Sequence, residues 1–372
     1  MRRTKFETSN SSWLQAIHID GWLLAALVLL MSVGLITIYS AGGQDWALVQ
    51  RQLVRLGLAM FVMLVLAQVP PLALQRLSIY VYVVGVLLLV AVLLIGVTGK
   101  GAQRWLDLGV FRFQPSELLK LAVPMMIAWY ISRNTLPPRT FQVLVAIILV
   151  VTPTLLIAKQ PDLGTSLLIA SSGIFAIFLA GLRWKLLTMF TVLASAFTPI
   201  LWFFLMKDYQ KQRVLTFLDP ESDPLGAGYH IIQSKIAIGS GGLDGKGWLQ
   251  GTQSQLEFLP ERHTDFIFSV FSEEFGFVGV VLLVALYLLI VLRGMIIAMR
   301  AQEAYSKLLA GSITLTFFVY VFVNMGMVSG ILPVVGVPLP LISYGGTSMV
   351  TLMAGFGILM SIATRKRLLS RE

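Results

Sequence analysis

Residues 21–41 read GWLLAALVLLMSVGLITIYSA, a run of 21 residues without a charged side chain. A helix needs about 20 mostly apolar residues to cross the hydrocarbon core of a bilayer. The run is too long for the core of a signal peptide, so we interpret it as a retained first span. With nine further runs, the predicted spans are 21–41, 52–69, 78–97, 115–131, 141–158, 164–182, 185–206, 266–293, 306–329 and 345–364.

The composition also indicates a bilayer around the chain. Hydrophobic residues make up 57% of the 372 residues and charged residues 12%, about half the charged fraction of water-soluble domains. The absence of cysteine excludes disulfides and thiolate metal sites, and no two of the three histidines are spaced to share a metal. We therefore predict an all-α polytopic integral membrane protein, a single transmembrane domain over residues 1–372, without a metal site.

The distribution of charge predicts the orientation. With both termini inside, the inner loops hold 15 of the 28 basic residues but only four of the 18 acidic residues. Because an excess of Lys and Arg marks the cytoplasmic side, residues 1–20 and 365–372 are predicted to be cytoplasmic. The one large loop, 207–265 between the seventh and eighth spans, then lies outside, and its apolar content predicts short helices. Nucleic acid is not an expected partner, because the basic residues form no stripe interleaved with aromatics.

Three acidic residues stand at the predicted outer ends of even-numbered spans: Glu117, Asp162 and Asp265. A helix N-terminus carries unpaired N–H groups and partial positive charge, so each acid is also explained as a simple cap. Thr264 is likewise a candidate N-cap just before Asp265. These residue types at this depth indicate either helix capping or a polar cleft.

Lys120 supports the interpretation of these residues as a polar cleft. It lies three residues after Glu117, on the same helical face, inside an apolar run where a charge usually faces a cavity or a partner. A plain ion pair with Glu117 explains it equally well, so both interpretations stay open. The other basic residues that we assign to the outer side of the cleft are Arg104, Lys159 and Arg213.

Asp265 is the residue to which we assign chemistry. It ends the long loop and precedes an aromatic, apolar helix start, where burial raises and the helix end lowers the pKa of a carboxyl group. An ionised aspartate at this place can take a proton from an attacking hydroxyl group. His263 is the alternative base; its other role is a hydrogen bond that orders the loop.

The segment 324–348 reads NMGMVSGILPVVGVPLPLISYGGTS. Its prolines 333, 338 and 340 cannot all lie in one regular helix, so we predict an irregular, partly re-entrant segment between the last two spans. Irregular backbone at membrane depth is tolerated only against protein or water. The segment is therefore either a tightly packed outer loop or a wall of the cleft, with Ser343 as a hydrogen-bond donor.

Four ordered motifs resemble the SEDS family (shape, elongation, division and sporulation) over essentially the whole chain. They are QPSE at 114–117, QPDLGT at 160–165, PERHTDF at 260–266 and the segment 324–348. The stretch WLQGTQSQLEFLPER at 248–262 resembles the elongation branch of that family.

The resemblance implies a peptidoglycan glycosyltransferase that polymerises lipid II at the outer face of the bacterial cytoplasmic (inner) membrane during cell elongation. The essential aspartate of the family corresponds to Asp265, and its cleft residues correspond to Glu117, Lys120 and Asp162. Lys120, Arg104 and Arg213 would stabilise the departing pyrophosphate.

The resemblance also implies partners: a class B penicillin-binding protein (a transpeptidase) and other elongation-complex membrane proteins. No cofactor is implied, although a divalent cation that bridges the pyrophosphate and Asp265 is left open. Two other functions are weighed against the enzyme. A lipid II flippase would need charged residues reachable from both faces, and a non-catalytic scaffold for a transpeptidase would need no buried lysine.

Overall fold

Nine of the ten predicted spans coincide with helices in the part of the chain that the structure describes. The computed structural model describes residues 17–365 except 100, 101, 108, 110, 111, 183–187, 190, 191, 193, 194, 197, 198, 200, 207, 224, 225 and 256–260. The nine helices are α2 (Gly21–Ala41), α3 (Trp46–Gln68), α4 (Pro71–Ile95), α5 (Pro115–Ser132), α6 (Thr140–Lys159), α7 (Leu163–Leu179), α12 (Ile267–Arg300), α13 (Ala304–Val328) and α14 (Thr347–Thr364). Ten of the 22 residues in the predicted span 185–206 lie outside the described residues, and the span ends in the π-helical turn η1 (Leu201–Leu205).

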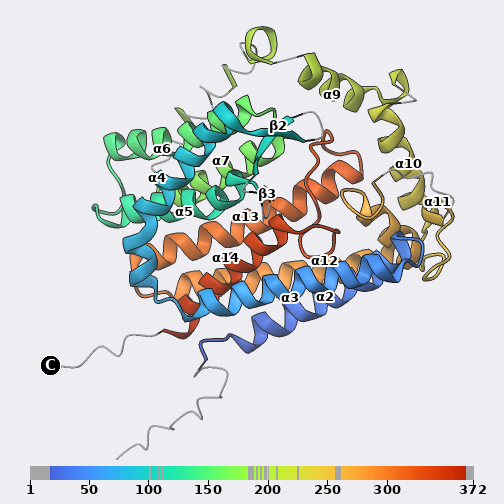
Figure 1. Ribbon diagram of the computed structural model, residues 1–372, viewed down its shortest axis with the longest axis horizontal. Coiled ribbons are helices and arrows are strands. Elements are labelled where there is room, and N and C mark those ends of the chain that lie inside the picture. Colours follow the sequence, from blue (N-terminus) through green and yellow to red (C-terminus); the bar gives the residue numbers. More distant parts are fainter. Residues whose placement is uncertain are drawn as a thin grey trace, which may run out of the picture.

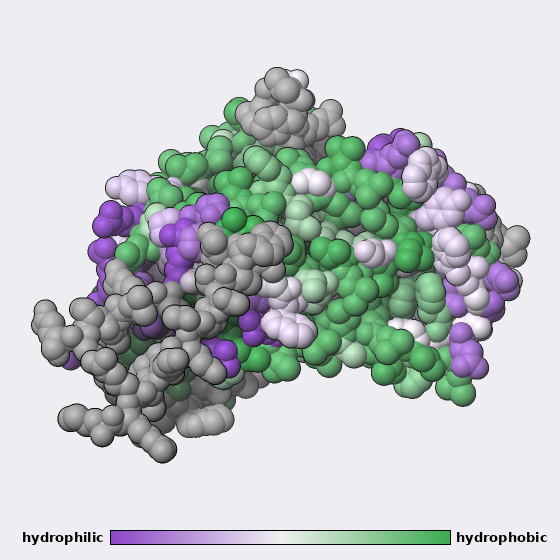
Figure 2. Space-filling view, turned by 90° about the horizontal axis from the view of Figure 1, so that it is seen from below, coloured by the Kyte–Doolittle hydropathy of each residue, from purple (hydrophilic) through white to green (hydrophobic). Residues whose placement is uncertain are grey.

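Seven of the described helices are long and apolar enough to cross a membrane: α2, α3, α4, α6, α12, α13 and α14. The space-filling surface agrees, because hydrophobic residues form a broad area between hydrophilic ends (Figure 2). The chain is therefore an all-α polytopic membrane protein. Helices α3 and α4 begin about two turns before the predicted spans, because a further apolar turn (residues 46–49 and 71–74) precedes the polar pairs Gln50–Arg51 and Gln75–Arg76.

Helix α5 lies at the centre of the bundle. It packs against α4, α6, α7, α13 and α14, and most of its residues are buried. Although it carries Glu117 and Lys120, its polar groups meet protein rather than lipid. This arrangement explains how a helix less apolar than its neighbours is stable inside a membrane.

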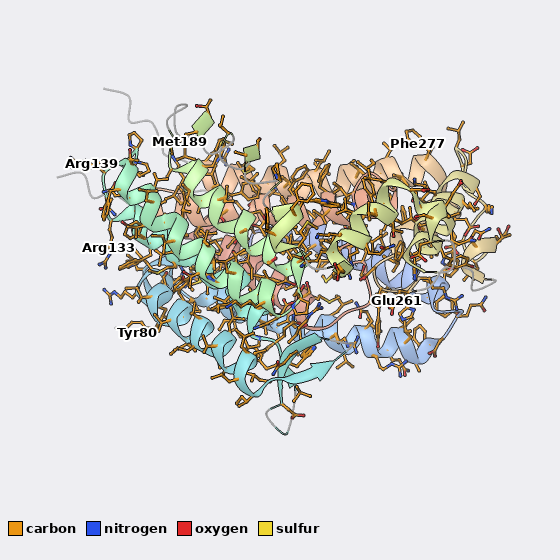
Figure 3. The ribbon with its side chains drawn as sticks, turned by 90° about the horizontal axis from the view of Figure 1, so that it is seen from above. Tyr80, Arg133, Arg139, Met189, Glu261 and Phe277 are labelled. Atoms are coloured by element: carbon orange, nitrogen blue, oxygen red, sulfur yellow. The ribbon has the colours of Figure 1, made fainter. Side chains whose placement is uncertain are left out.

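The two ends of the bundle differ. The terminal face, as we name it, is the end where Ile17, Gln68, Arg293 and Arg365 lie; there the side chain of Gln68 donates to the Ile17 carbonyl at 2.6 Å. The loop face is the opposite end, with the small sheet, the described residues of 208–265 and residues 329–346 (Figure 1). In Figure 3, Arg133 lies toward the terminal face and Glu261 toward the loop face.

The loop face holds a small sheet that the sequence analysis did not predict. Its three antiparallel strands are β1 (Val97–Gly99), β2 (Ala102–Asp107) and β3 (Arg112–Phe113), in the order β1-β2-β3. The long loop contains short helices, as predicted: α9 (Asp208–Leu218), η2 (Pro220–Ser222), α10 (Ala227–Ser240) and α11 (Thr252–Gln255).

Helix α12 is broken at Gly276, which has φ 61° and ψ −166°. The backbone N–H groups of Phe277 and Val278 donate to the carbonyls of Gly242 and Leu243, at 2.9 and 3.1 Å. A loop from the segment 241–247 thus occupies the break, and a Cβ atom at Gly276 would lie 2.2 Å from the backbone nitrogen of Gly245. Only glycine fits this contact and this backbone conformation.

The segment 329–346 packs tightly against α2. A Cβ atom on Gly34 would lie 2.7 Å from the Leu341 carbonyl oxygen and 2.9 Å from the Ile342 Cα, both backbone atoms that cannot rotate away. The predicted irregular segment is therefore a packed part of the fold. Its position depends on the small size of Gly34.

We predict that Gly34→Ala destabilises the protein by about 1–3 kcal/mol, because overpacking displaces the segment 329–346. Gly57→Ala in the adjacent helix α3 is the matched control. No atom lies within 4 Å of a Cβ at Gly57, so this change should stabilise by about 0.5–1 kcal/mol through helix propensity. Thermal unfolding in detergent measures both, and equal melting temperatures for the two variants would contradict the packing argument.

Candidate functional site

Asp265 is positioned by an asparagine on α13. The Asn324 side chain is fully buried, and its Nδ2 donates to the Asp265 carbonyl at 2.9 Å and to the Val337 carbonyl at 2.7 Å. One amide thus joins the start of α12 to the segment 329–346. The Asp265 side chain is partly exposed, and its Oδ2 lies 3.5 Å from the position of a Cβ on Gly336. Gly336, with φ 73°, lets the backbone pass close to the carboxylate.

The residues just before Asp265 are fastened to the same segment. The Ser343 hydroxyl donates to the Thr264 carbonyl at 2.7 Å and accepts from the Leu339 N–H at 2.7 Å. The Tyr344 N–H donates to the His263 carbonyl at 2.8 Å. The Ser343 hydrogen is therefore already donated within the protein, so the expected donor to substrate serves the loop instead.

Thr264 is not the N-cap that the sequence suggested. Helix α12 begins at Ile267 with Phe266 at the N-cap position, and the Thr264 hydroxyl donates instead to the Glu261 carboxylate at 2.7 Å. Asp265 therefore precedes the helix rather than lying in its first turn. The His263 ring meets the ring of Tyr344 edge-on, with centroids 5.7 Å apart, which fits its loop-ordering role.

Glu117 and Lys120 form a buried ion pair. Lys120 Nζ lies 2.7 Å from Glu117 Oε1, and both side chains are about nine-tenths buried. The ammonium also lies 5.3 Å from the centre of the Tyr320 ring on α13. A pocket of about 30 Å³ adjoins Lys120, which is room for water. The ion pair is therefore present, and the small pocket beside it has mostly apolar walls, such as Leu121, Ile313 and Phe317.

Asp162 caps α7 and also joins other polar groups. One oxygen accepts from the Thr165 N–H at 3.2 Å, so the capping interpretation holds. The other oxygen lies 3.5 Å from Gln114 Nε2 and 3.7 Å from Arg104 Nε. Arg104 comes from β2 and also donates to the Pro161 carbonyl, so the sheet holds a cation over the start of α7.

These groups form one cluster at the loop face. Tyr320, beside Lys120, and Asn324, bonded to Asp265, lie one helical turn apart on α13. Gly164, next to Asp162 on α7, packs against Val335 and Val337 of the segment that also contacts Asp265. Direct ion pairs therefore join Arg104 to Asp162 and Glu117 to Lys120, while Asp265 is connected to them through α13 and the segment 335–337.

Two predicted site residues lie outside the cluster. Lys159 and Arg213 are exposed, and neither forms an ion pair with a described residue. Arg213 is carried by α9, which stands apart from the bundle (Figure 1).

The sequence analysis missed Arg55 and His230. The Arg55 guanidinium lies 4.3 Å from the centre of the Tyr344 ring, which the His263 ring also contacts. Arg55 lies inside a predicted span, and that signal could have identified it as it identified Lys120. His230 on α10 stacks on Phe266 at 5.6 Å, and burial lowers the pKa of its imidazole. Nothing in the sequence linked α10 to Phe266.

Comparison with known proteins shows the family of the chain. A family model described as "Cell cycle protein", which covers FtsW, RodA and SpoVE, matches residues 13–368. The chain belongs to this family. The chain is 58% identical to "Peptidoglycan glycosyltransferase MrdB" of Escherichia coli K12 over 96% of both chains. It is 40% identical to "Probable peptidoglycan glycosyltransferase FtsW" of Geobacter metallireducens over 76% of this chain and 75% of that one.

Two solved structures share the fold. A chain from work described as "Structural coordination of polymerization and crosslinking by a peptidoglycan synthase complex" has a TM-score of 0.81 and 35% identity, over 93% of this chain and 97% of that one. The rod shape determining protein RodA of Thermus thermophilus has a TM-score of 0.70 and 30% identity, over 93% and 96% of the two chains. The SEDS family that the motifs indicated is thus confirmed.

In this family member, a buried carboxylate fastens the long loop to α12. Glu273 is fully buried, and its Oε1 lies 2.7 Å from Lys246 Nζ, 3.0 Å from the Thr252 hydroxyl and 3.0 Å from the Gln253 N–H. The neighbouring Glu274 accepts from the Ser40 hydroxyl of α2. Glu273 is therefore a structural anchor two turns from Asp265. Among the described residues, no group of three or more His, Cys, Asp or Glu side chains could hold a metal ion.

We predict that Lys246→Met destabilises the protein by about 3 kcal/mol, because it leaves the Glu273 carboxylate buried without its cation. Adding Glu273→Gln should recover part of that loss, since the neutral amide needs no counter-ion. Lys307→Met, at an exposed position on α13, is the control and should change stability by less than about 0.5 kcal/mol. Strictly additive effects in this double-mutant cycle, measured by unfolding in detergent, would argue against the anchor.

Proposed function

We infer that this chain is a peptidoglycan glycosyltransferase that polymerises lipid II at the loop face of the membrane. The family match over residues 13–368 and the names of its relatives support this activity. The observation that carries the proposal lies on α13. Asn324 bonds to the Asp265 carbonyl, and Tyr320, one helical turn away on the same helix, contacts Lys120. A proton acceptor and a cation at one open end of a bundle suit transfer of a sugar from a lipid pyrophosphate.

In the proposed step, Asp265 accepts the proton of the acceptor sugar's 4-hydroxyl group. The hydroxyl oxygen forms a bond to the anomeric carbon of the donor sugar as the bond from that carbon to the pyrophosphate oxygen breaks. The electron pair leaves with the lipid pyrophosphate. A positioned base commonly contributes about 10²- to 10⁴-fold to the rate of such a step.

Basic side chains of the cluster would stabilise the negative charge of the leaving pyrophosphate. Lys120 and Arg104 are the candidates that the geometry favours, because each lies in the cluster at the loop face. An arginine fork matches two phosphate oxygens. Arg213, exposed on α9, is not needed for this role in the present conformation. A divalent cation would have to be shared between the pyrophosphate and single acids such as Asp265.

We predict that Asp265→Asn lowers lipid II polymerisation by about 100-fold or more, because the amide keeps the shape of the side chain but cannot accept the proton. Asp208→Asn, an exposed change on α9 of the same face, is the matched control and should retain activity. Glycan strands are scored with purified protein, lipid II and the transpeptidase, with EDTA and with added Mg²⁺. Full activity of Asp265→Asn, at an unchanged melting temperature, would show that Asp265 is not the general base.

Two further assays separate the alternatives. A flippase would move fluorescent lipid II across liposome membranes without forming polymer. A scaffold would support normal wall synthesis in cells when Lys120, Asp162 and Asp265 are all replaced by alanine. The one-sided charge cluster favours the enzyme over both.

We further propose a class B penicillin-binding transpeptidase as the partner, in keeping with the crosslinking complex among the structural relatives. An apolar groove of about 370 Å³ runs between α10, α12 and α13, and it suits the membrane helix of such a partner. Its lining includes Ile238, Leu288, Phe318, Phe322 and Met325. Leu288 and Phe322 are about half exposed, as expected of side chains that await a helix.

We predict that Leu288→Trp, which fills the groove, lowers co-purification of the transpeptidase at least about tenfold, the equivalent of about 1.4 kcal/mol. Leu289→Trp is the matched control, because Leu289 is equally exposed on α12 but does not line the groove. Equal recovery of the partner with both variants would place the interface elsewhere.

A further inference from the structure

The terminal face contains a pocket that the glycosyl transfer does not use. It has a volume of about 660 Å³ and lies between the start of α2, the end of α12 and the end of α14. A second pocket of about 400 Å³ adjoins it and shares Gln302, Thr364 and Arg365. The elements meet there directly, since the His18 ring lies 3.2 Å from the Thr364 hydroxyl. Figure 1 shows α2 beginning beside the end of α14.

Three arginines line the pocket, and one acid neutralises only one of them. Asp20 forms a two-pronged ion pair with Arg293, at 3.1 Å from Nε and 2.5 Å from Nη2. The same carboxylate caps α2, so both of its oxygens are already bonded. Among the described residues, no carboxylate lies within ion-pair distance of Arg300 or Arg365. Among the residues that the structure describes, Arg300 and Arg365 therefore line the pocket without an ion-pair partner, and the adjoining pocket also holds the acid Glu303.

Arg300 and Arg365 differ in their exposure and in their hydrogen bonds. Arg300 is exposed at the last residue of α12. Arg365 donates through Nη2 to the Gln68 carbonyl, while its Nε is buried without a hydrogen-bond partner. Arg365 nevertheless lines both pockets, so a phosphate oxygen would meet the accessible part of its side chain.

The remaining wall is apolar and lies at the edge of the hydrophobic region. Ile19, Ile296, Ile297 and Ile362 line it, and Trp22 stands at the mouth with 80% of its surface exposed. Tryptophan at a helix end marks the level of lipid headgroups. A soluble anion would use the arginines but leave the isoleucines unpartnered. A ligand that is anionic at one end and apolar at the other satisfies both walls.

We propose that this pocket binds the headgroup of an anionic phospholipid of the adjacent leaflet. Its phosphate would lie between the guanidinium groups of Arg300 and Arg365, and its glycerol esters against the isoleucines. Arginine binds phosphate oxygens through paired N–H groups. Each basic residue near an anionic lipid surface adds about 1 kcal/mol, so two correspond to about 30-fold in affinity.

The test is lipid retention by the full-length protein in detergent, measured by native mass spectrometry with equal amounts of phosphatidylglycerol and phosphatidylcholine. We expect wild type to prefer phosphatidylglycerol and Arg300→Gln/Arg365→Gln to lose that preference by about 30-fold. Lys307→Gln removes a charge from the same face outside the pocket and should keep the preference. Arg293 is left intact, because its loss would leave Asp20 buried and unpaired.

Controls separate binding from folding and from a soluble anion. Arg365→Lys keeps the charge but not the fork, so partial retention is expected, and melting temperatures should agree among all variants. Glycerol 3-phosphate should compete only weakly, because it lacks the acyl esters. Equal retention of the two lipids by wild type, unchanged retention by the double variant, or glycerol 3-phosphate binding as tight as the lipid would each overturn the proposal.

Discussion

A carboxylate and an ammonium group cannot face hydrocarbon at low cost, and this constraint organises the bundle. Glu117 and Lys120 lie on one helix, so α5 has to be enclosed, and α4, α6, α7, α13 and α14 surround it. The remaining helices can then present leucine, valine and phenylalanine side chains to the lipid, as the hydrophobic surface shows (Figure 2). The need to bury Glu117 and Lys120 thus explains both the position of the site and the central position of α5 in the bundle.

Helix α13 is the element through which the separate parts of the site act together. Tyr320 meets Lys120, and Asn324, one turn further on, holds Asp265 and Val337. A shift of α13 along its axis would change the distance between Asp265 and Lys120. The same shift would break the hydrogen bond from Asn324 to Val337 in the segment 329–346. Such coupling makes Asn324 a positioning residue, although it need not touch substrate.

The sequence predicted the spans well because apolar length is a local property. It predicted Glu117, Lys120 and Asp162 as neighbours because buried charge in a span is rare and has to be paired. It placed Arg213 in the cleft only on the assumption that outer basic residues converge, and α9 carries that residue outward. Arg55 and the packing of α10 on Phe266 depend on contacts between distant segments, which no local pattern records.

The location of buried charge within the bundle bears on the kind of function. In the part of the chain that the structure describes, Glu117, Lys120, Asp162 and Glu273 all lie near the loop face, within about three turns of a helix end. On the terminal face, the buried Asp20 lies at the very start of α2 and is paired with Arg293 near the end of α12. A transporter needs polar groups along a path that both faces reach in turn. Buried charge that extends several turns inward at the loop face, but stays at the start of α2 on the terminal face, fits a transferase whose lipid-linked substrates lie in the leaflet at the loop face.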